Sequence, residues 1–85
     1  MEGADLSHGY LEGTDFTKAH LNNAILIDAH LKNADLTDAC LERALLAGVD
    51  LEMAKLIRAD VKGAELTEAH LVGHLPFPTA LPTGL

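Results

Sequence analysis

The fold is decided by one short stretch of sequence, Asn33-Ala34-Asp35-Leu36-Thr37-Asp38-Ala39-Cys40-Leu41. It contains a five-residue unit, namely Ala, a mostly polar residue, Leu and two turn-prone residues, and then the start of the next unit. Leu or a related residue recurs at every fifth position through 14 consecutive units, and we call these positions the Leu series. The series is Leu6, Leu11, Phe16, Leu21, Leu26, Leu31, Leu36, Leu41, Leu46, Leu51, Leu56, Val61, Leu66 and Leu71. The residue two positions before each member is Ala in 11 of the 14 units.

A period of five excludes both a regular helix and a straight strand. An α-helix turns about 100° per residue, so a Leu at every fifth position would move around its surface and bury no continuous face. A strand alternates its side chains between two faces, so an odd period would send successive Leu residues to opposite faces. Both conflicts disappear if the chain turns a corner in every unit. Ala and Leu then point inward, the residue between them points outward, and the last two residues form the bend.

The bend positions carry residue types that favour turns. They include Gly13, Asn23, Asp28, Asn33, Asp38, Gly48, Gly63 and Gly73. The sequence therefore predicts a closed coil with the Leu series inside. The period by itself does not decide how many units close one level of this coil.

Several units resemble those of the pentapeptide-repeat proteins, and the resemblance covers residues 4–73. Examples are Ala4-Asp5-Leu6-Ser7-His8, Ala34-Asp35-Leu36-Thr37-Asp38 and Ala64-Glu65-Leu66-Thr67-Glu68. The resemblance implies an all-β fold, the right-handed quadrilateral β-helix, with four units in each coil. The 14 units would then make a solenoid of about three and a half coils, with residues 20 apart stacked at about 4.8 Å.

We predict one repeat domain, residues 1–73, followed by a Pro-rich tail, residues 74–85. The tail contains all three prolines of the chain, and proline adds poorly to a hydrogen-bonded ladder. A solenoid end exposes apolar side chains and needs a cap. Leu75, Phe77 and Leu81 are candidates for that cap, and the alternative is that the tail is a linker.

Composition narrows the function. The net charge of −7, from 13 acidic and 6 basic residues, argues against binding to nucleic acid or to anionic membranes. Cys40 is the only cysteine, so no intrachain disulfide can form. No apolar run is long enough to span a bilayer, and no secretory signal is visible, so we expect a cytoplasmic protein.

Two outward columns contain residue types found in active or metal sites. His20, Cys40 and Asp60 form one column, but parallel side chains one strand spacing apart do not converge on an ion as zinc ligands must. The other column is Tyr10, His30, Asp50 and His70. For it we expect surface hydrogen bonding, because a convex face offers no pocket that excludes water. We therefore predict no metal, no cofactor and no enzymatic activity.

A third outward region is apolar. Ile25, Ile27, Leu45 and Ala47 should cluster on one exposed face, with a polar rim of Asp5, Asp28, Glu65 and Thr67. An exposed apolar patch with a polar rim is typical of a contact surface, although isolated surface Ile and Leu are also ordinary. We interpret these four residues as a candidate contact for a protein partner.

The bends also carry stacked charges, which predict ion pairs between levels. One ladder is Lys18, Asp38 and Arg58, and the other is Glu12, Lys32 and Glu52. Outward residues should otherwise tolerate change, so Asp35→Leu should be nearly silent.

The leading functional hypothesis is a non-catalytic protein-interaction or scaffold module. Its partner is an unidentified protein, and a homodimer is one option because symmetric dimers are the commonest closed assembly. The alternative, implied by the resemblance, is a DNA-mimic inhibitor or regulator of a type II topoisomerase, DNA gyrase. DNA carries one charge per about 1.7 Å, whereas the acidic residues here alternate with basic ones such as Lys32 and Lys55.

Overall fold

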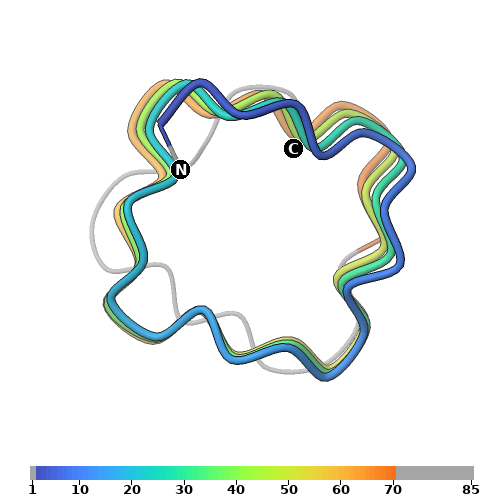
Figure 1. The fold of residues 1–85 in the computed structure, drawn as a ribbon, viewed down its shortest axis with the longest axis horizontal. Coiled ribbons are helices and arrows are strands. Elements are labelled where there is room, and N and C mark those ends of the chain that lie inside the picture. Colours follow the sequence, from blue (N-terminus) through green and yellow to red (C-terminus); the bar gives the residue numbers. More distant parts are fainter. Residues whose placement is uncertain (1, 71–85) are drawn as a thin grey trace.

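A computed structural model of the chain describes residues 2–70, which wind into a coil with four sides. Figure 1 looks along the coil and shows successive levels superposed on a nearly square outline. The chain runs clockwise as it recedes from the viewer, so the coil is right-handed (Figure 1). The described residues contain neither a helix nor a strand longer than one residue. No helix long and apolar enough to cross a membrane lies among them.

Ten isolated parallel bridges define the register, and each joins residues 20 apart. Asp5 pairs with Ile25, Ile25 with Leu45, and Leu45 with Glu65. One level therefore takes four five-residue units. We name the sides by these units, with side 1 at 4–8, 24–28, 44–48 and 64–68, and side 2 at 9–13, 29–33, 49–53 and 69–70. Side 3 holds 14–18, 34–38 and 54–58, and side 4 holds 19–23, 39–43 and 59–63.

Every unit ends in a β-turn with one residue in the left-handed conformation. The fourteen such residues have φ between 57° and 70°, and only four of them are Gly. The N–H of the next residue closes the turn on a Leu carbonyl, as in the 3.1 Å bond from Gly9 to Leu6. A positive φ at the third turn position alone is the signature of a type II turn. Gly, Asn and Asp tolerate this conformation, but the coil also imposes it on Lys18, Arg43 and Met53.

The backbone hydrogen bonds explain why the coil can impose this conformation. In the unit 24–28, Ile25 donates to Ala4 at 2.8 Å on one neighbouring level. Leu26 and Asp28 donate to Leu45 and Ala47 on the other level, at 2.7 and 2.9 Å. The residue with positive φ therefore supplies one of the three bonds that hold each unit to its neighbours. In this unit the N–H of Ile27, the residue after Leu26, is the one backbone donor without a backbone acceptor.

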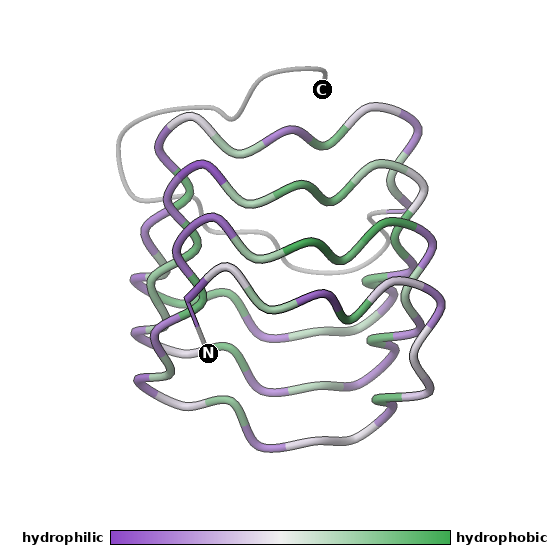
Figure 2. Ribbon diagram, turned by 45° about the horizontal axis from the view of Figure 1, so that its top comes forward, coloured by the Kyte–Doolittle hydropathy of each residue, from purple (hydrophilic) through white to green (hydrophobic). Residues whose placement is uncertain are grey.

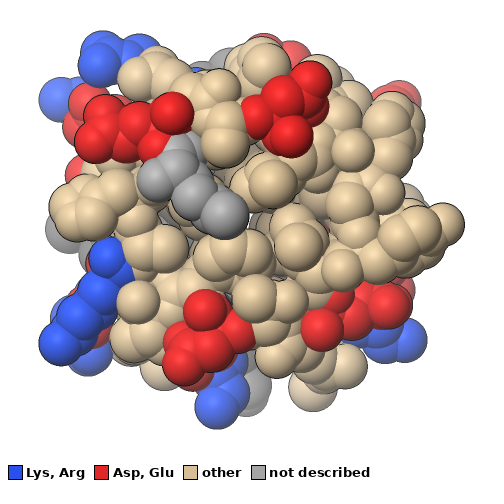
Figure 3. Space-filling model, in the orientation of Figure 1, with Lys and Arg blue, Asp and Glu red and all other residues tan. Residues whose placement is uncertain are grey.

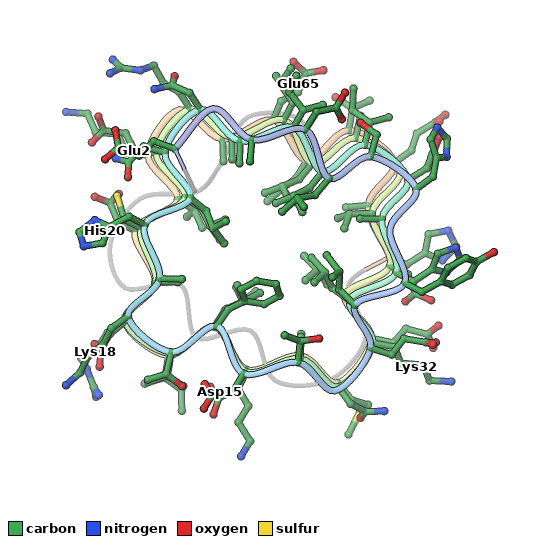
Figure 4. All side chains as sticks on the ribbon, in the orientation of Figure 1. Glu2, Asp15, Lys18, His20, Lys32 and Glu65 are labelled. Atoms are coloured by element: carbon green, nitrogen blue, oxygen red, sulfur yellow. The ribbon has the colours of Figure 1, made fainter. Side chains whose placement is uncertain are left out.

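The interior is filled by the Leu series, as Figure 4 shows. Phe16 and the members from Leu21 to Leu66 are buried, and Leu36 is fully enclosed between the levels of Phe16 and Leu56. The Ala residues two positions earlier are buried as well along most of the coil. Leu6 and Leu11 in the first level are only partly buried against this core. The domain limit at 73, Leu71 and the tail 74–85 lie outside the described residues.

Candidate interaction surface

Five outward residues are aspartates that cap the turn following them. Each accepts a hydrogen bond from the N–H two residues later, which is the donor that the ladder leaves over, at 2.9–3.1 Å. These residues are Asp5, Asp15, Asp35, Asp50 and Asp60. The side-chain oxygen mimics a backbone acceptor, as in an Asx-turn. The frequent Asp in this position therefore belongs to the architecture of the coil.

Three of these caps are reinforced by a hydroxyl group. Ser7, Thr17 and Thr37 each donate a second hydrogen bond to the same aspartate oxygen. Together with the backbone N–H, these hydroxyl groups lower the pKa of the three carboxyls, Asp5, Asp15 and Asp35. Asp35→Leu would remove two of these hydrogen bonds, so we expect it to lower stability slightly and not to be nearly silent.

The column of possible metal ligands keeps the parallel arrangement of the coil. Bridges join His20 to Cys40 and Cys40 to Asp60. Asp60 accepts the N–H of Lys62, and the Cys40 thiol is half-buried. Across residues 2–70, no three His, Cys, Asp or Glu side chains are grouped so that they could hold a metal ion.

One predicted charge ladder forms an ion pair. Arg58 donates to both oxygens of Asp38, from Nε at 2.7 Å and from Nη2 at 3.1 Å. This contact lowers the pKa of Asp38 and raises that of Arg58. Lys18 makes no ion pair within the described part of the chain, and neither does the ladder of Glu12, Lys32 and Glu52. Stacking in one column therefore does not by itself produce an ion pair.

The apolar residues Ile25, Ile27, Leu45 and Ala47 lie on two adjacent levels of side 1, and we call them the Ile25 surface. Figure 2 shows strongly hydrophobic residues at the middle of this side. All four are half-buried, so they are less exposed than the sequence predicted. The parallel ladder is the reason, since each residue is covered in part by its neighbours on the adjacent levels.

The most exposed large apolar side chains lie elsewhere and were missed by the sequence-based prediction. Tyr10 is 83% exposed, Met53 59% and Ile57 41%. Met53 and Ile57 occupy bend positions, where the repeat usually has polar residues. That departure from the repeat was the available signal.

A groove of about 350 Å³ runs between the end of side 1 and the start of side 2. It is lined by His8, Asp28, Ala29, His30, Gly48, Asp50 and His70. The sequence did not predict this groove, which is open to solvent and so does not exclude water. Ala29 forms the floor because its short side chain points inward, while the flanking turn and outward residues form the walls.

The polar groups of the groove are only loosely paired. His8 Nδ1 lies 3.9 Å from Asp28 Oδ2. The ring of His30 stacks on Tyr10, with centroids 4.9 Å apart and planes within 11°. Asp50 accepts the N–H of Glu52 at 3.1 Å, and the structure shows none of the hydrogen bonds expected among His30, Asp50 and His70. The carboxylates and imidazoles of the groove therefore have atoms that can still accept hydrogen bonds from a ligand.

No outward column is acidic on every described level, since Ile25 and Leu45 separate Asp5 from Glu65, and Lys55 follows Asp35. Figure 3 looks onto the N-terminal end of the coil and shows the acidic side chains in separate groups around its rim, with basic groups between. Figure 4 places Asp15 and Glu65 on opposite sides of the coil and Lys18 at a corner beside Asp15.

Stacked identical units, each contacting only its neighbours along the axis, define the chain as a solenoid repeat protein. A family model described as pentapeptide repeats matches residues 1–38 and 34–73, with eight copies. The chain therefore belongs to the pentapeptide-repeat family, which confirms the resemblance read from its units.

Solved structures of the family share the fold. A pentapeptide-repeat protein from the Arabidopsis thaliana thylakoid lumen is 28% identical over 86% of this chain, with a TM-score of 0.55. Rfr23 from the cyanobacterium Cyanothece 51142 is 30% identical over 84%, with a TM-score of 0.58. HetL from Nostoc sp. strain PCC 7120, a protein involved in the regulation of heterocyst differentiation, is 33% identical over 76%, with a TM-score of 0.54.

The chain spans only 54%, 46% and 33% of the lengths of these three proteins, in the same order. A comparison with curated proteins finds no match. The family thus accounts for the coil, and the outward residues are where this chain differs from a generic repeat.

Proposed function

We propose that this chain is a non-catalytic protein-interaction module whose contact with a protein partner is the Ile25 surface. The observation that supports this proposal most directly is the pair Ile25 and Leu45. These two outward residues are apolar on adjacent levels, at a position where aspartate would cap the turn. A half-buried apolar face of this kind becomes fully buried only when another molecule covers it.

The rest of the molecule supports the same proposal. The Leu series and the Ala residues two positions earlier form the core, and the bend residues form the turns. What varies freely from unit to unit is the outward surface. HetL, a relative with the same repeat, is involved in regulating heterocyst differentiation, and a regulatory role through binding is consistent with such a surface.

A second copy of the chain is one partner that this surface would fit. Two Ile25 surfaces related by a two-fold axis would cover each other. Sedimentation at micromolar concentration tests this option, because the wild-type chain would run at dimer mass and an Ile25→Lys/Leu45→Lys variant at monomer mass.

The topoisomerase hypothesis has less support. A mimic of DNA needs a continuous run of negative charge. On this coil Arg58 neutralises Asp38, and Lys55 follows Asp35 in the same column. Inhibition of gyrase in a supercoiling assay at stoichiometric protein would favour that hypothesis over ours.

The proposal is tested by comparing partner capture by three forms of the chain. The wild type, Ile25→Lys/Leu45→Lys and the control Met53→Lys/Ile57→Lys are immobilised and exposed to extract from the source organism. The control also replaces two apolar residues by lysine but leaves side 1 unchanged. We expect a stoichiometric partner that the wild type and the control retain and the Ile25 surface variant loses. Equal capture by all three forms, with melting temperatures confirming that each is folded, would refute the proposal.

A further inference from the structure

The groove adjoins the Ile25 surface directly. Ile27 is followed in sequence by Asp28, and Ala47 is followed by Gly48, so surface and groove share the same two levels. A partner that covers the Ile25 surface would therefore reach the groove at its edge and place one of its own side chains there.

The groove offers anionic acceptors on both walls. Asp28 stands at the end of side 1, with a side chain 56% exposed, and Nδ1 of His8 lies 3.9 Å from its Oδ2, beyond hydrogen-bond distance. Asp50 stands on side 2 and uses one oxygen for the N–H of Glu52. Its second oxygen accepts no hydrogen bond from the described residues. Two carboxylates across one groove are suited to a ligand that donates in more than one direction.

Gly48 makes room for the carboxylate of Asp28. Its φ of +70° favours glycine, and a Cβ atom built there would collide with Oδ1 of Asp28. The carboxylate of Asp28 therefore leans across the turn of the next level and occupies the space that a side chain at position 48 would fill. The flat ring of His30, stacked on Tyr10, lines the groove beside this space.

Building on the proposed function, we propose that this groove receives an arginine side chain of the protein partner. A guanidinium group is planar and carries five donors in a fixed fork, so it can bind Asp28 and Asp50 together and lie against an aromatic ring. A lysine ammonium offers a point charge without that planar match. The described residues contain no group of three ligands for a metal ion, so a cationic side chain fits the groove better than a bare cation.

The test uses a five-residue peptide, acetyl-Leu-Ala-Arg-Ala-Leu-amide, titrated against the full chain and followed by amide chemical shifts. The same peptide with citrulline in place of Arg is the neutral control. We expect saturable shifts at Asp28, His30, Gly48 and Asp50 with the Arg peptide at pH 7.5. We expect binding about tenfold weaker with citrulline, since its neutral urea group lacks the positive charge and has fewer N–H donors than a guanidinium group.

Matched variants separate the groove from general attraction by an acidic protein. Asp28→Asn/Asp50→Asn removes two charges while keeping both turns. Asn23 and Asn33 already occupy the bend position that corresponds to Asp28, and an amide oxygen at position 50 can still accept the N–H of Glu52. Glu42→Gln/Asp60→Asn removes two charges from side 4. Gly48→Asn displaces the carboxylate of Asp28 without changing the charge. We expect weakening of about tenfold for the first and third variants and none for the second.

Two results would overturn the proposal. One is equal affinity of the chain for the Arg and citrulline peptides. The other is that Asp28→Asn/Asp50→Asn and Glu42→Gln/Asp60→Asn weaken binding of the Arg peptide equally. The outcome is distinct from that of the proposed function. Partner capture that requires the Ile25 surface but is unchanged in Asp28→Asn/Asp50→Asn refutes the groove alone. Arg-peptide binding without any captured partner refutes the interaction module and leaves a guanidinium site.

Discussion

Sides 1 and 3 of the coil have the same backbone and the same core but use their outward positions differently. On side 3, Asp15 and Asp35 cap the turns at Thr17 and Thr37 on successive levels. On side 1, only Asp5 does so, because Ile25 and Leu45 occupy the next two levels. Within residues 2–70, the N–H groups of Ile27 and Ala47 then have no protein acceptor.

The difference shows that capping is optional in this coil. Three bonds to neighbouring levels and one turn bond hold each unit, whichever residue points outward. An uncapped N–H at the surface can reach water, so its loss costs little. Side 1 thus departs from the local rule without disturbing the core, and such departures are where functional sites are expected.

The largest expected effect removes the core that both sides share. Leu36 is fully buried, so Leu36→Asp places a carboxylate among apolar side chains without a partner. We expect a loss of roughly 4 kcal/mol or more, enough to unfold the protein. Circular dichroism and thermal melting measure it. Asp35→Leu at the neighbouring outward position is the control and should lower the melting temperature by only a few degrees. Similar melting of the two variants would contradict the inward and outward assignment.

A smaller effect compares two corners. Gly48→Ala and Gly13→Ala both place a side chain at positive φ, +70° and +67°, which costs about 1–2 kcal/mol. A Cβ atom at Gly13 meets nothing within 4 Å, whereas at Gly48 it displaces the carboxylate of Asp28, the flexible end of a side chain. We expect similar losses of stability in urea titrations, with weakened Arg-peptide binding only in Gly48→Ala. Weakened binding in Gly13→Ala would contradict the role given to Gly48.

A still smaller effect should appear in acid and should belong mainly to side 3. The hydroxyls of Thr17 and Thr37 lower the pKa of Asp15 and Asp35 below 3.8 in the folded state. The stability that these two carboxylates contribute is therefore fully present above the pKa they have in the unfolded chain. It is lost as the pH falls through the lower pKa they have in the folded protein. We expect wild-type stability to decrease below about pH 4. Asp15→Asn/Asp35→Asn should decrease less steeply.

Melting temperatures between pH 7 and pH 2 provide the measurement. Glu12→Gln/Glu65→Gln is the matched control, since it removes two carboxyls for which the structure shows no hydrogen bond, and it should follow the wild type. An identical slope for the wild type and Asp15→Asn/Asp35→Asn would show that the caps do not contribute to acid stability.

The smallest effect on stability is expected when side 1 is given capping residues like those of side 3. Ile25→Asn/Leu45→Asn gives side 1 an amide oxygen that can cap the following N–H, as aspartate does on side 3. We expect a melting temperature within a few degrees of the wild type but loss of partner capture. A folded variant that still captures the partner would remove the Ile25 surface from the binding site. Unfolding would show that these residues support the core.

The regular part of the fold could be predicted because the residue types and spacing within each unit determine which side chains point inward and where the chain bends. Ala34 and Leu36 are two positions apart and so share a face, and Asn33 and Asp38 suit the bend. The period also placed a bend at Met53, but the left-handed conformation of this residue could not be predicted from its type, because methionine does not favour it. Leu6 and Leu11 were expected in the core with the other members of the Leu series, but the first level covers them only in part.

The candidate site was predicted less well than the fold. The residues of the Ile25 surface were found because their apolar character breaks the outward pattern, but their half-buried state depends on neighbours 20 residues away. The groove was missed altogether. Its walls, Asp28 and Asp50, belong to different columns on consecutive levels, and nothing in the spacing of one unit brings them together.

By itself, the sequence determined that the chain forms a closed coil, which residues point inward and where it turns, because a period of five with Ala and Leu two positions apart admits few other solutions. Only the tertiary structure decided which outward residues meet. The ion pair of Arg58 with Asp38, the stack of Tyr10 on His30 and the space beside Gly48 all depend on four units closing one level. The physical reason is that local geometry sets the direction of each side chain, whereas its neighbours across the ladder are set by the closure of the coil.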